Sequence, residues 1–244
     1  MNPALDLGLP LFCAHLVGDF IAQTDGMAAG KKKATILAMH AAIQAAIAYV
    51  LAGRWGLWPV PLWIFFTHGA VDFLKVRTAR KGTAVFLADQ AAHLAVIAAL
   101  AIVYGADGSS HWAGLFGRIW PWTLLIACGA ILCVRVSAIL IGFWVQPYLD
   151  EIQRAGSPAV PVRGLTNGGR VIGQWERCLI FLLVLIGQPG AIGFLVAAKS
   201  IFRFGELTDR QNRMEAEYIT IGTLMSFGIA LAISAATVCL ARRL

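Results

Sequence analysis

Three pairs of a histidine and an aspartate, each separated by four residues, are the strongest chemical signal in the sequence. The pairs are His15 with Asp19, His68 with Asp72, and Asp89 with His93. Residues four apart lie above one another on the same face of a helix. Imidazole and carboxylate groups bind zinc, iron and manganese, and inside membranes they also relay protons. The spacing therefore predicts paired polar groups on three helices, with chemistry that suits a cation or a proton.

Other polar residues continue or adjoin these pairs, namely Gln23, His40, Lys75 and Gln90. The expected metal ligands are His15, Asp19, His40, His68, Asp72, Asp89 and His93. Seven candidates exceed one tetrahedral site, so one metal with an outer shell of polar partners and two metals are both compatible with the set. The expected cofactor is a divalent transition metal, with zinc ahead of manganese and iron.

The composition places these residues in a membrane. The chain has 244 residues, of which 59% are hydrophobic and only 14% are charged, whereas soluble domains carry about 25% charged residues. The mean hydropathy of +0.72 excludes soluble enzymes, disordered chains, coiled coils and secreted disulfide scaffolds. Unbroken apolar runs, rather than alternating ones, predict an all-α polytopic transmembrane bundle and not a barrel. The expected partner is therefore membrane lipid, and the net charge of +7 indicates topology anchors rather than a nucleic-acid partner.

Apolar runs bounded by glycine, proline and charge predict about seven spans and one short element. The spans are expected near residues 4–25, 35–52, 57–77, 83–104, 119–145, 169–187 and 215–240, with a polar connection over 146–168. The run 188–204 is short for a span and is expected to be re-entrant or tilted. We divide the chain into a four-helix unit over 1–105, which carries the His/Asp set, and C-terminal helices over 106–244. The five cysteines lie in apolar stretches without metal-site spacing and are expected to be small core residues.

Basic residues predict the orientation. Lys31, Lys32 and Lys33 follow the first span, and further lysines and arginines follow the third, so both connections are expected in the cytoplasm and the N-terminus outside. Asp19, Asp72 and Asp89 then lie six or seven residues, or about 10 Å, from the cytoplasmic edge. The order of histidine and aspartate inverts on the fourth span, which runs in the opposite direction, so the pairs are expected at matching depth.

The same residues support a resemblance to a family. The motifs are His15-x-x-Gly18-Asp19-Phe20-x-x-Gln23, a basic turn, His40, His68-x-x-x-Asp72-x-x-Lys75 and Asp89-Gln90-x-x-His93. Over about the first 105 residues the chain resembles the bacterial inner-membrane proteins grouped as domain of unknown function 3307. The resemblance implies an integral protein of the bacterial inner membrane and brings no established activity.

A second polar set lies in the C-terminal half. Asn167, Gly168, Gly169 and Arg170 precede a span, so backbone donors at its N-terminus are placed to accept an anion. The residues expected to contact a substrate here are Arg135, Glu176, Lys199 and Arg203. The alternative for most of them is interfacial snorkelling and pairing between glutamate and arginine.

Three functions are compatible with the sequence. The first is a metal-dependent hydrolase acting near the cytoplasmic leaflet on a lipid-linked, amphiphilic or anionic substrate. In it a spare carboxylate such as Asp19 or Asp89 is the general base, Lys75 neutralises the substrate, and Gln23 and Gln90 contact it. The second is a proton- or cation-coupled transporter. The third is a non-catalytic scaffold or sensor whose polar core specifies helix packing.

Overall fold

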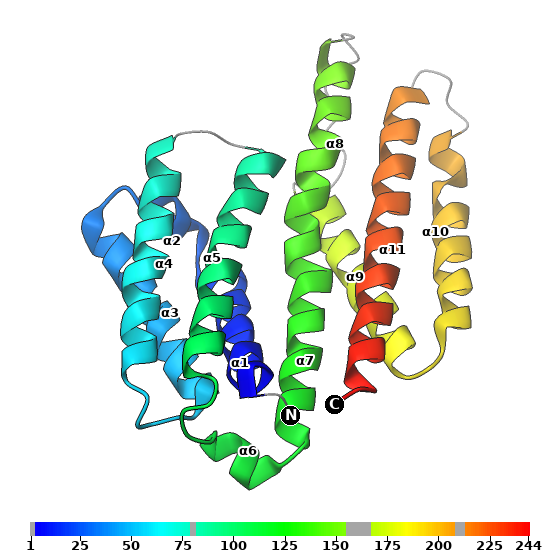
Figure 1. The fold of residues 1–244 in the computed structure, drawn as a ribbon. Coiled ribbons are helices and arrows are strands. Elements are labelled where there is room, and N and C mark those ends of the chain that lie inside the picture. The colour runs from blue at the N-terminus through cyan, green and yellow to red at the C-terminus, as the bar shows by residue number, and fades with distance from the viewer. Residues whose placement is uncertain (1–2, 79–81, 155–166, 208–212) are drawn as a thin grey trace. The chain divides into compact units, whose positions relative to one another are not determined.

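The computed structural model describes residues 3–78, 82–154, 167–207 and 213–244, with the side chains of 202–207 and 213 excepted (Figure 1). Every regular element among these residues is helical, which confirms the helical class. The chain divides into two compact units. The first unit comprises residues 1–131 and 240–244, and the second comprises 132–239. The domain boundary expected at residue 105 stays a prediction.

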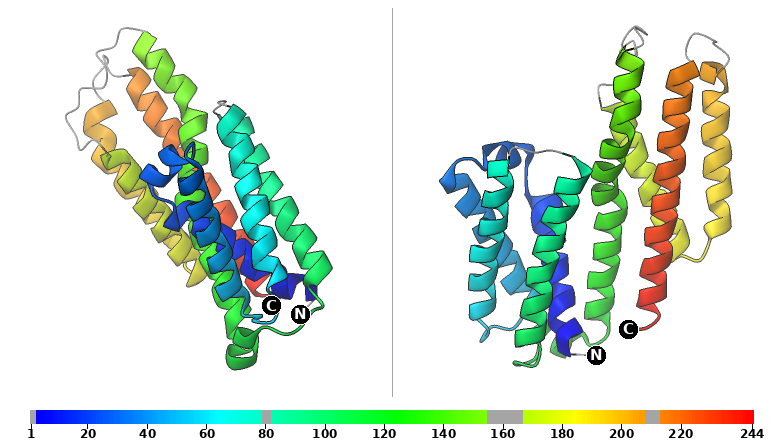
Figure 2. Two further views of the ribbon diagram at one scale, coloured as in Figure 1. Left: turned by 90° about the vertical axis from the view of Figure 1, so that its left-hand side faces the viewer. Right: turned by 45° about the horizontal axis from the view of Figure 1, so that its top comes forward.

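The first unit is built around four longer helices. Its elements are α1 (Pro3–Val17), the π-helical turn η1 (Gly18–Ala22), α2 (Asp25–Gly30), α3 (Ala34–Ala52), α4 (Pro59–Thr78), α5 (Thr83–Tyr104), α6 (His111–Phe116) and α7 (Ile119–Ile131). Helix α1 packs against α3, α5 and α7, and α4 packs against α3 and α5 (Figures 1 and 2). One half of this interior is apolar, with Leu7, Leu11 and Ile64 at its centre. Alanines of α3 complete it, because small side chains let the helices approach closely.

The buried side chain of Arg54, which is 5% exposed, links three segments at one end of this unit. Its guanidinium donates hydrogen bonds to the carbonyl oxygens of Tyr104, Gly105 and Asp107, at 2.9 to 3.3 Å. It also pairs with the carboxylate of Asp6 at 2.9 Å. One buried cation thereby ties the start of α1 and the end of α5 to the turn after α3.

The second unit contains the π-helical turn η2 (Leu132–Val136), α8 (Ser137–Arg154), α9 (Gly168–Leu185), the 3₁₀ turn η3 (Pro189–Ala191), α10 (Ile192–Leu207) and α11 (Arg213–Ala241). Helix α9 packs against η2, α8 and α10. The run 188–204, expected to be a short element, is a 3₁₀ turn followed by the short helix α10.

Among the residues that the structure describes, five helical segments are long and apolar enough to cross a membrane, fewer than the seven spans predicted. They are Pro3–Ala22, Ala34–Ala52, Thr83–Tyr104, Ile119–Arg154 and Met214–Ala241. Helices α4 and α9 form where spans were expected but are not among them. His68, Asp72 and Lys75 make α4 more polar, and α9 carries Arg170, Glu176 and Arg177.

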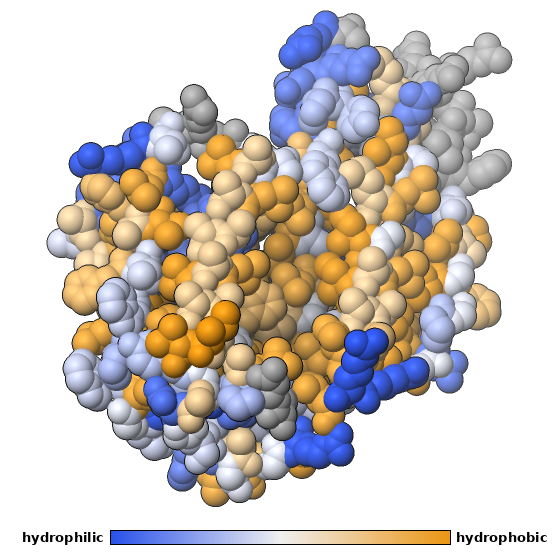
Figure 3. Space-filling view, in the orientation of Figure 1, coloured by the Kyte–Doolittle hydropathy of each residue, from blue (hydrophilic) through white to orange (hydrophobic). Residues whose placement is uncertain are grey.

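Many large apolar side chains are exposed on both units, as expected of helices that face lipid. Examples are Ile102, 75% exposed, in the first unit and Phe194, 80% exposed, in the second. Figure 3 shows hydrophobic residues over much of the visible surface of each unit. The composition and these five segments together identify a helical membrane-type protein.

The first span, expected near residues 4–25, is Pro3–Ala22, and the π-helical turn closes it. Other local expectations were wrong. The fifth span does not end at residue 145, since helical residues continue to Arg154 through part of the expected connection. Cys13, Cys128 and Cys133 are buried as expected, whereas Cys178 and Cys239 are exposed.

Candidate metal centre

All seven predicted ligands lie together in the first unit. They come from five elements, with His15 on α1, Asp19 on η1, which continues α1, His40 on α3, His68 and Asp72 on α4, and Asp89 and His93 on α5. None of these side chains is more than 9% exposed. Because a charged group inside a helix bundle is costly, partners from neighbouring helices must satisfy it. The polar half of the interior is therefore a single cluster rather than a set of separate pairs.

The closest set of ligand atoms in the cluster comes from Asp19, His40 and His68. The Nε2 atoms of the two histidines are 2.9 Å apart. Oδ1 of Asp19 lies 3.2 Å from Nε2 of His40 and 3.3 Å from Nε2 of His68. A metal with bonds of about 2.0–2.1 Å and tetrahedral angles separates its ligand atoms by about 3.3–3.4 Å. The three separations are close to this value, and two of them are also those of hydrogen bonds. The atoms are therefore spaced closely enough to serve as three ligands of one metal ion.

Asp72 lies beside this face and is held by a lysine. Its Oδ2 atom is 3.5 Å from Nε2 of both His40 and His68. The same oxygen accepts a hydrogen bond of 2.6 Å from Nζ of Lys31, whose side chain is only 8% exposed. The sequence pattern missed this contact, because three consecutive lysines after a span are typical of a topology anchor.

Asp89 repeats the arrangement on α5. Its Oδ2 atom accepts hydrogen bonds from Nζ of Lys75 at 2.6 Å and from the Gln90 amide at 3.0 Å. The carbonyl oxygen of the Gln90 side chain in turn lies 3.1 Å from Nε2 of His15. The second oxygen of Asp89 and Nε2 of His93 are buried, 3.7 Å apart, and neither has a hydrogen-bond partner among the described residues. Two unsatisfied buried atoms this close leave room for a bridging ligand.

Three groups of residues in the cluster each bring possible ligand atoms within 4.8 Å of one another. They are Asp19–His40–His68, His15–His68–His93 and Asp72–Asp89–His93. His68 and His93 are each shared by two groups, and their rings stack with centroids 4.3 Å apart. A cavity of about 20 Å³ adjoins His15, His68 and His93, which is enough for one water molecule.

The charge of the cluster also favours a cation. Three carboxylates face two ammonium groups, those of Lys31 and Lys75. With neutral histidines the cluster therefore carries one net negative charge in a region of low dielectric. A cation held by these residues would offset that negative charge.

Residues 7–116 match the model of a family described as protein of unknown function (DUF3307). The resemblance to DUF3307 is confirmed. The matched residues include all seven predicted ligands together with Lys31, Lys75 and Gln90, and none of the second unit. Comparisons with curated proteins and with solved structures found no match to this chain.

The π-helical turn sets the placement of Asp19 in the region that matches DUF3307. The N–H of Gln23 donates to the carbonyl of Gly18, five residues back, at 3.0 Å. A Cβ atom on Gly18 would overlap the side-chain amide of Gln44, which is 2% exposed, so Gln44 would have to shift if Gly18 were replaced. Such turns occur often at functional sites.

Two features of the DUF3307 domain differ from expectation. Gln23 does not extend the polar stripe, because it follows the last helical residue and adopts extended backbone. Its Oε1 atom is nevertheless buried without a hydrogen-bond partner in the described part of the chain. Nδ1 of His40 is also buried and has no hydrogen-bond partner among the described residues. In metal sites, by contrast, the ring nitrogen that does not bind the metal generally donates its N–H to an outer acceptor.

The predicted substrate residues of the second unit are not all brought together in one site. Glu176 and Lys199 form an ion pair of 2.7 Å and line a common cavity. Arg135 is exposed and is not among the residues that line this cavity. The side chain of Arg203 lies outside the described residues. Arg177, which the sequence analysis did not select, is 4% exposed and lines the cavity.

Proposed function

We propose that the DUF3307 domain binds a divalent transition metal ion through Asp19, His40 and His68 and acts as a membrane-embedded hydrolase. The observation that carries the proposal is the separation of 2.9 to 3.3 Å among their three ligand atoms. Two imidazoles and one carboxylate suit zinc, and they suit iron or manganese as well. Three protein ligands leave a coordination position for water, which is the arrangement of catalytic rather than structural zinc sites.

A metal held by these residues would lower the pKa of water, so that hydroxide would be available near neutral pH to attack an ester or phosphoester. Asp72, 3.5 Å from both histidine nitrogens, is placed either to complete the ligand set or to accept the proton of that water. Lys31 hydrogen-bonds the Asp72 carboxylate and keeps it oriented toward the histidines. The water-sized cavity beside His68 gives the water a place next to the ligands.

The substrate that this arrangement suits is amphiphilic and anionic. Lys75, at 38%, is the most exposed side chain of the ion pairs in the cluster and lies in the last turn of α4. Its ammonium group can pair with an anionic headgroup while it still contacts Asp89. A lipid-linked substrate would bring its apolar part alongside the exposed apolar side chains of the same helices.

The first experiment is elemental analysis of the full-length protein, purified in detergent without chelator and compared with His40→Ala. We expect about one or two equivalents of metal in the wild type and a loss of most of it in the variant. His111→Ala is the matched control, because His111 is an exposed histidine of the same unit outside the cluster. A wild type that stays metal-free after incubation with zinc, manganese or iron would contradict the proposal.

The second experiment tests hydrolysis in the metal-loaded protein. Short-chain phospholipids and acyl esters in micelles are the substrates, and product release is followed with and without chelator. We expect activity that a chelator abolishes, that added metal restores and that falls at least about 100-fold in Asp72→Asn. Metal binding without hydrolysis of any of these substrates would support the proposed metal site and contradict the proposed hydrolase activity.

The sharing of His68 and His93 among the ligand groups favours a second candidate, a cation or proton transporter. Overlapping ligand sets allow an ion to pass between neighbouring positions while it keeps some of its ligands. Proteoliposomes loaded with a zinc-sensitive dye distinguish the two functions. Zinc uptake that is lost in His93→Ala would support transport, whereas metal that stays bound without flux would support the hydrolase.

A further inference from the structure

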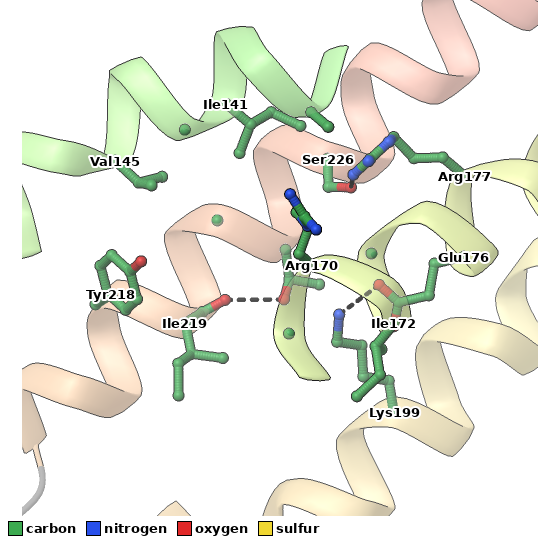
Figure 4. A pocket seen from close by; sticks show the side chains of 16 residues that line it. Ile141, Val145, Arg170, Ile172, Glu176, Arg177, Lys199, Tyr218, Ile219 and Ser226 are labelled. Carbon is green, nitrogen blue, oxygen red and sulfur yellow. Dashed lines mark hydrogen bonds and ion pairs between the residues drawn. The ribbon is translucent and has the colours of Figure 1, made fainter. Parts of the chain in front are cut away.

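The second unit contains a cavity of about 420 Å³, none of whose lining residues belongs to the His/Asp cluster. Helices α8, α9, α10 and α11 all contribute residues to it (Figure 4). Its walls are largely apolar and include Ile141, Val145, Ile172 and Ile219. The volume falls within the range of small-molecule sites, which combine apolar walls with a few polar groups that select the ligand.

The polar groups of this cavity are mainly cationic. Arg170, Arg177 and Lys199 line it, with Glu176 as the carboxylate among its lining residues. Lys199 is paired with Glu176 at 2.7 Å. Arg170 has no ion pair to any described residue, and Figure 4 shows its guanidinium in the midst of the lining residues. Two guanidinium groups therefore remain without a carboxylate in the described part of the unit.

Arg177 gives independent support for an anionic ligand. Only 4% of this residue is exposed. Its Nη1 donates to Oγ of Ser226 at 3.0 Å and its Nη2 to the carbonyl of Val134 at 3.1 Å, while the buried Nε has no partner among the described atoms. A buried charge with only neutral acceptors and one unused donor is costly. An anion in the cavity would compensate the charge.

The start of α9 adds backbone donors. Helix α9 begins at Gly168, and the side chain of Asn167 makes no capping hydrogen bond. The first amides of a helix have no partner within it and carry a partial positive charge. A Cβ atom at Gly169, which lines the cavity, would meet nothing within 4 Å, so a ligand can approach the backbone there.

We propose that this cavity binds a phosphate group carried on an apolar body, with Arg170 and Arg177 as its principal recognition groups. Guanidinium groups pair with phosphate through two parallel hydrogen bonds, and the apolar walls accommodate the attached chain. The phosphate can belong to a membrane phospholipid or to a soluble phosphorylated amphiphile. The proposal concerns the second unit alone and stands whether or not the first unit binds a metal.

The test is binding of dihexanoyl phosphatidylglycerol to the purified full-length protein, measured calorimetrically in an uncharged detergent with chelator present. Dihexanoylglycerol, which has similar acyl chains without the phosphate, is the ligand control. We expect saturable binding of the phospholipid and about tenfold weaker binding of the neutral compound. The chelator removes any contribution of the metal centre, so failure here is distinct from failure of the hydrolase proposal.

Variants locate the site. Arg170→Gln should weaken phospholipid binding about tenfold, whereas Arg154→Gln, the same change at an exposed residue that does not line the cavity, should leave it unchanged. Arg177→Lys keeps the buried charge and should weaken binding without loss of the folded state. Equal binding of both ligands by the wild type, or unchanged binding by both cavity variants in folded protein, overturns the proposal.

Competition by inorganic phosphate and by hexyl phosphate, a soluble phosphorylated amphiphile, distinguishes the two sources. If phosphate alone competes with the phospholipid at similar concentration, the anionic group is sufficient and the ligand can be soluble. If phosphate does not compete but hexyl phosphate does, the apolar body contributes and the ligand can still be soluble; if neither competes while the phospholipid binds, a membrane lipid is the ligand. No saturable binding of either compound contradicts the inference.

Discussion

The two units bury charge in opposite ways. In the first unit, carboxylates and histidines are packed against one another, and Asp72 and Asp89 are each held by a lysine at 2.6 Å. In the second unit, guanidinium groups line an open cavity of about 420 Å³ and are only partly paired. The first arrangement suits a small cation that needs close ligands, and the second suits a larger anion that needs space. Packing density, as much as the sign of the charge, separates the two kinds of site.

The largest effect is expected at Lys31, since its removal leaves Asp72 buried next to Asp19 without its ammonium partner. Lys31→Met should lower the free energy of unfolding by about 3–5 kcal/mol. Thermal unfolding in detergent measures this loss, and added zinc should recover part of it by taking over the compensation of charge. Lys32→Met, at an exposed neighbour, is the control. A variant as stable as the wild type would show that the pair contributes little.

Gly18→Ala tests the dense packing of the first unit directly. A Cβ atom there overlaps the Gln44 amide, so we expect a loss of about 1–3 kcal/mol in stability. The double variant Gly18→Ala/Gln44→Ala should recover most of the loss. In the second unit, Gly228 has open space around the added Cβ atom, and Gly228→Ala should not destabilise the protein. If Gly18→Ala and Gly228→Ala change the stability equally, the two units do not differ in packing density at these positions.

Lys75→Gln should have a smaller effect than Lys31→Met, although the two lysines make ion pairs of equal length. Lys75 is 38% exposed and Lys31 only 8%, and solvent screens the more exposed pair. We expect a loss of about 1 kcal/mol, measured by the same thermal unfolding. A loss as large as that of Lys31→Met would indicate that Asp89 depends on Lys75 alone, despite its bond to Gln90.

The smallest effect is expected at Glu176, and its sign is opposite. Glu176→Gln removes the carboxylate that lines the second cavity and releases Lys199 to the ligand. Binding of the phospholipid should strengthen about threefold, which is less than about 1 kcal/mol. Titration calorimetry with the same ligand measures it. Weaker binding in this variant would assign Glu176 a direct role in holding the ligand.

The sequence predicted the His/Asp cluster because its pattern is local. Pairs four residues apart fall on one helix face, and the cost of burying charge brings such faces together. Lys31 was missed because its position in a run of lysines resembles a loop anchor, and only the packing of α2 and α3 shows it to be buried. Arg177 and its cavity depend on α8, α9, α10 and α11, so no spacing along the chain reveals them. The number of spans was overestimated because α4 and α9 combine apolar length with several polar and charged side chains.

The π-helical turn at Gly18–Ala22 makes the length of this segment as important as its composition. An α-helix advances by about 100° per residue, so the residue at which the chain leaves α1 sets the direction of the next segment. Deleting one residue here would restore ordinary helical geometry and turn the segment that leads to Lys31 around the helix axis, away from Asp72. Over evolutionary time, substitutions at positions of the turn other than Gly18 and Asp19 should therefore be tolerated more readily than insertions or deletions.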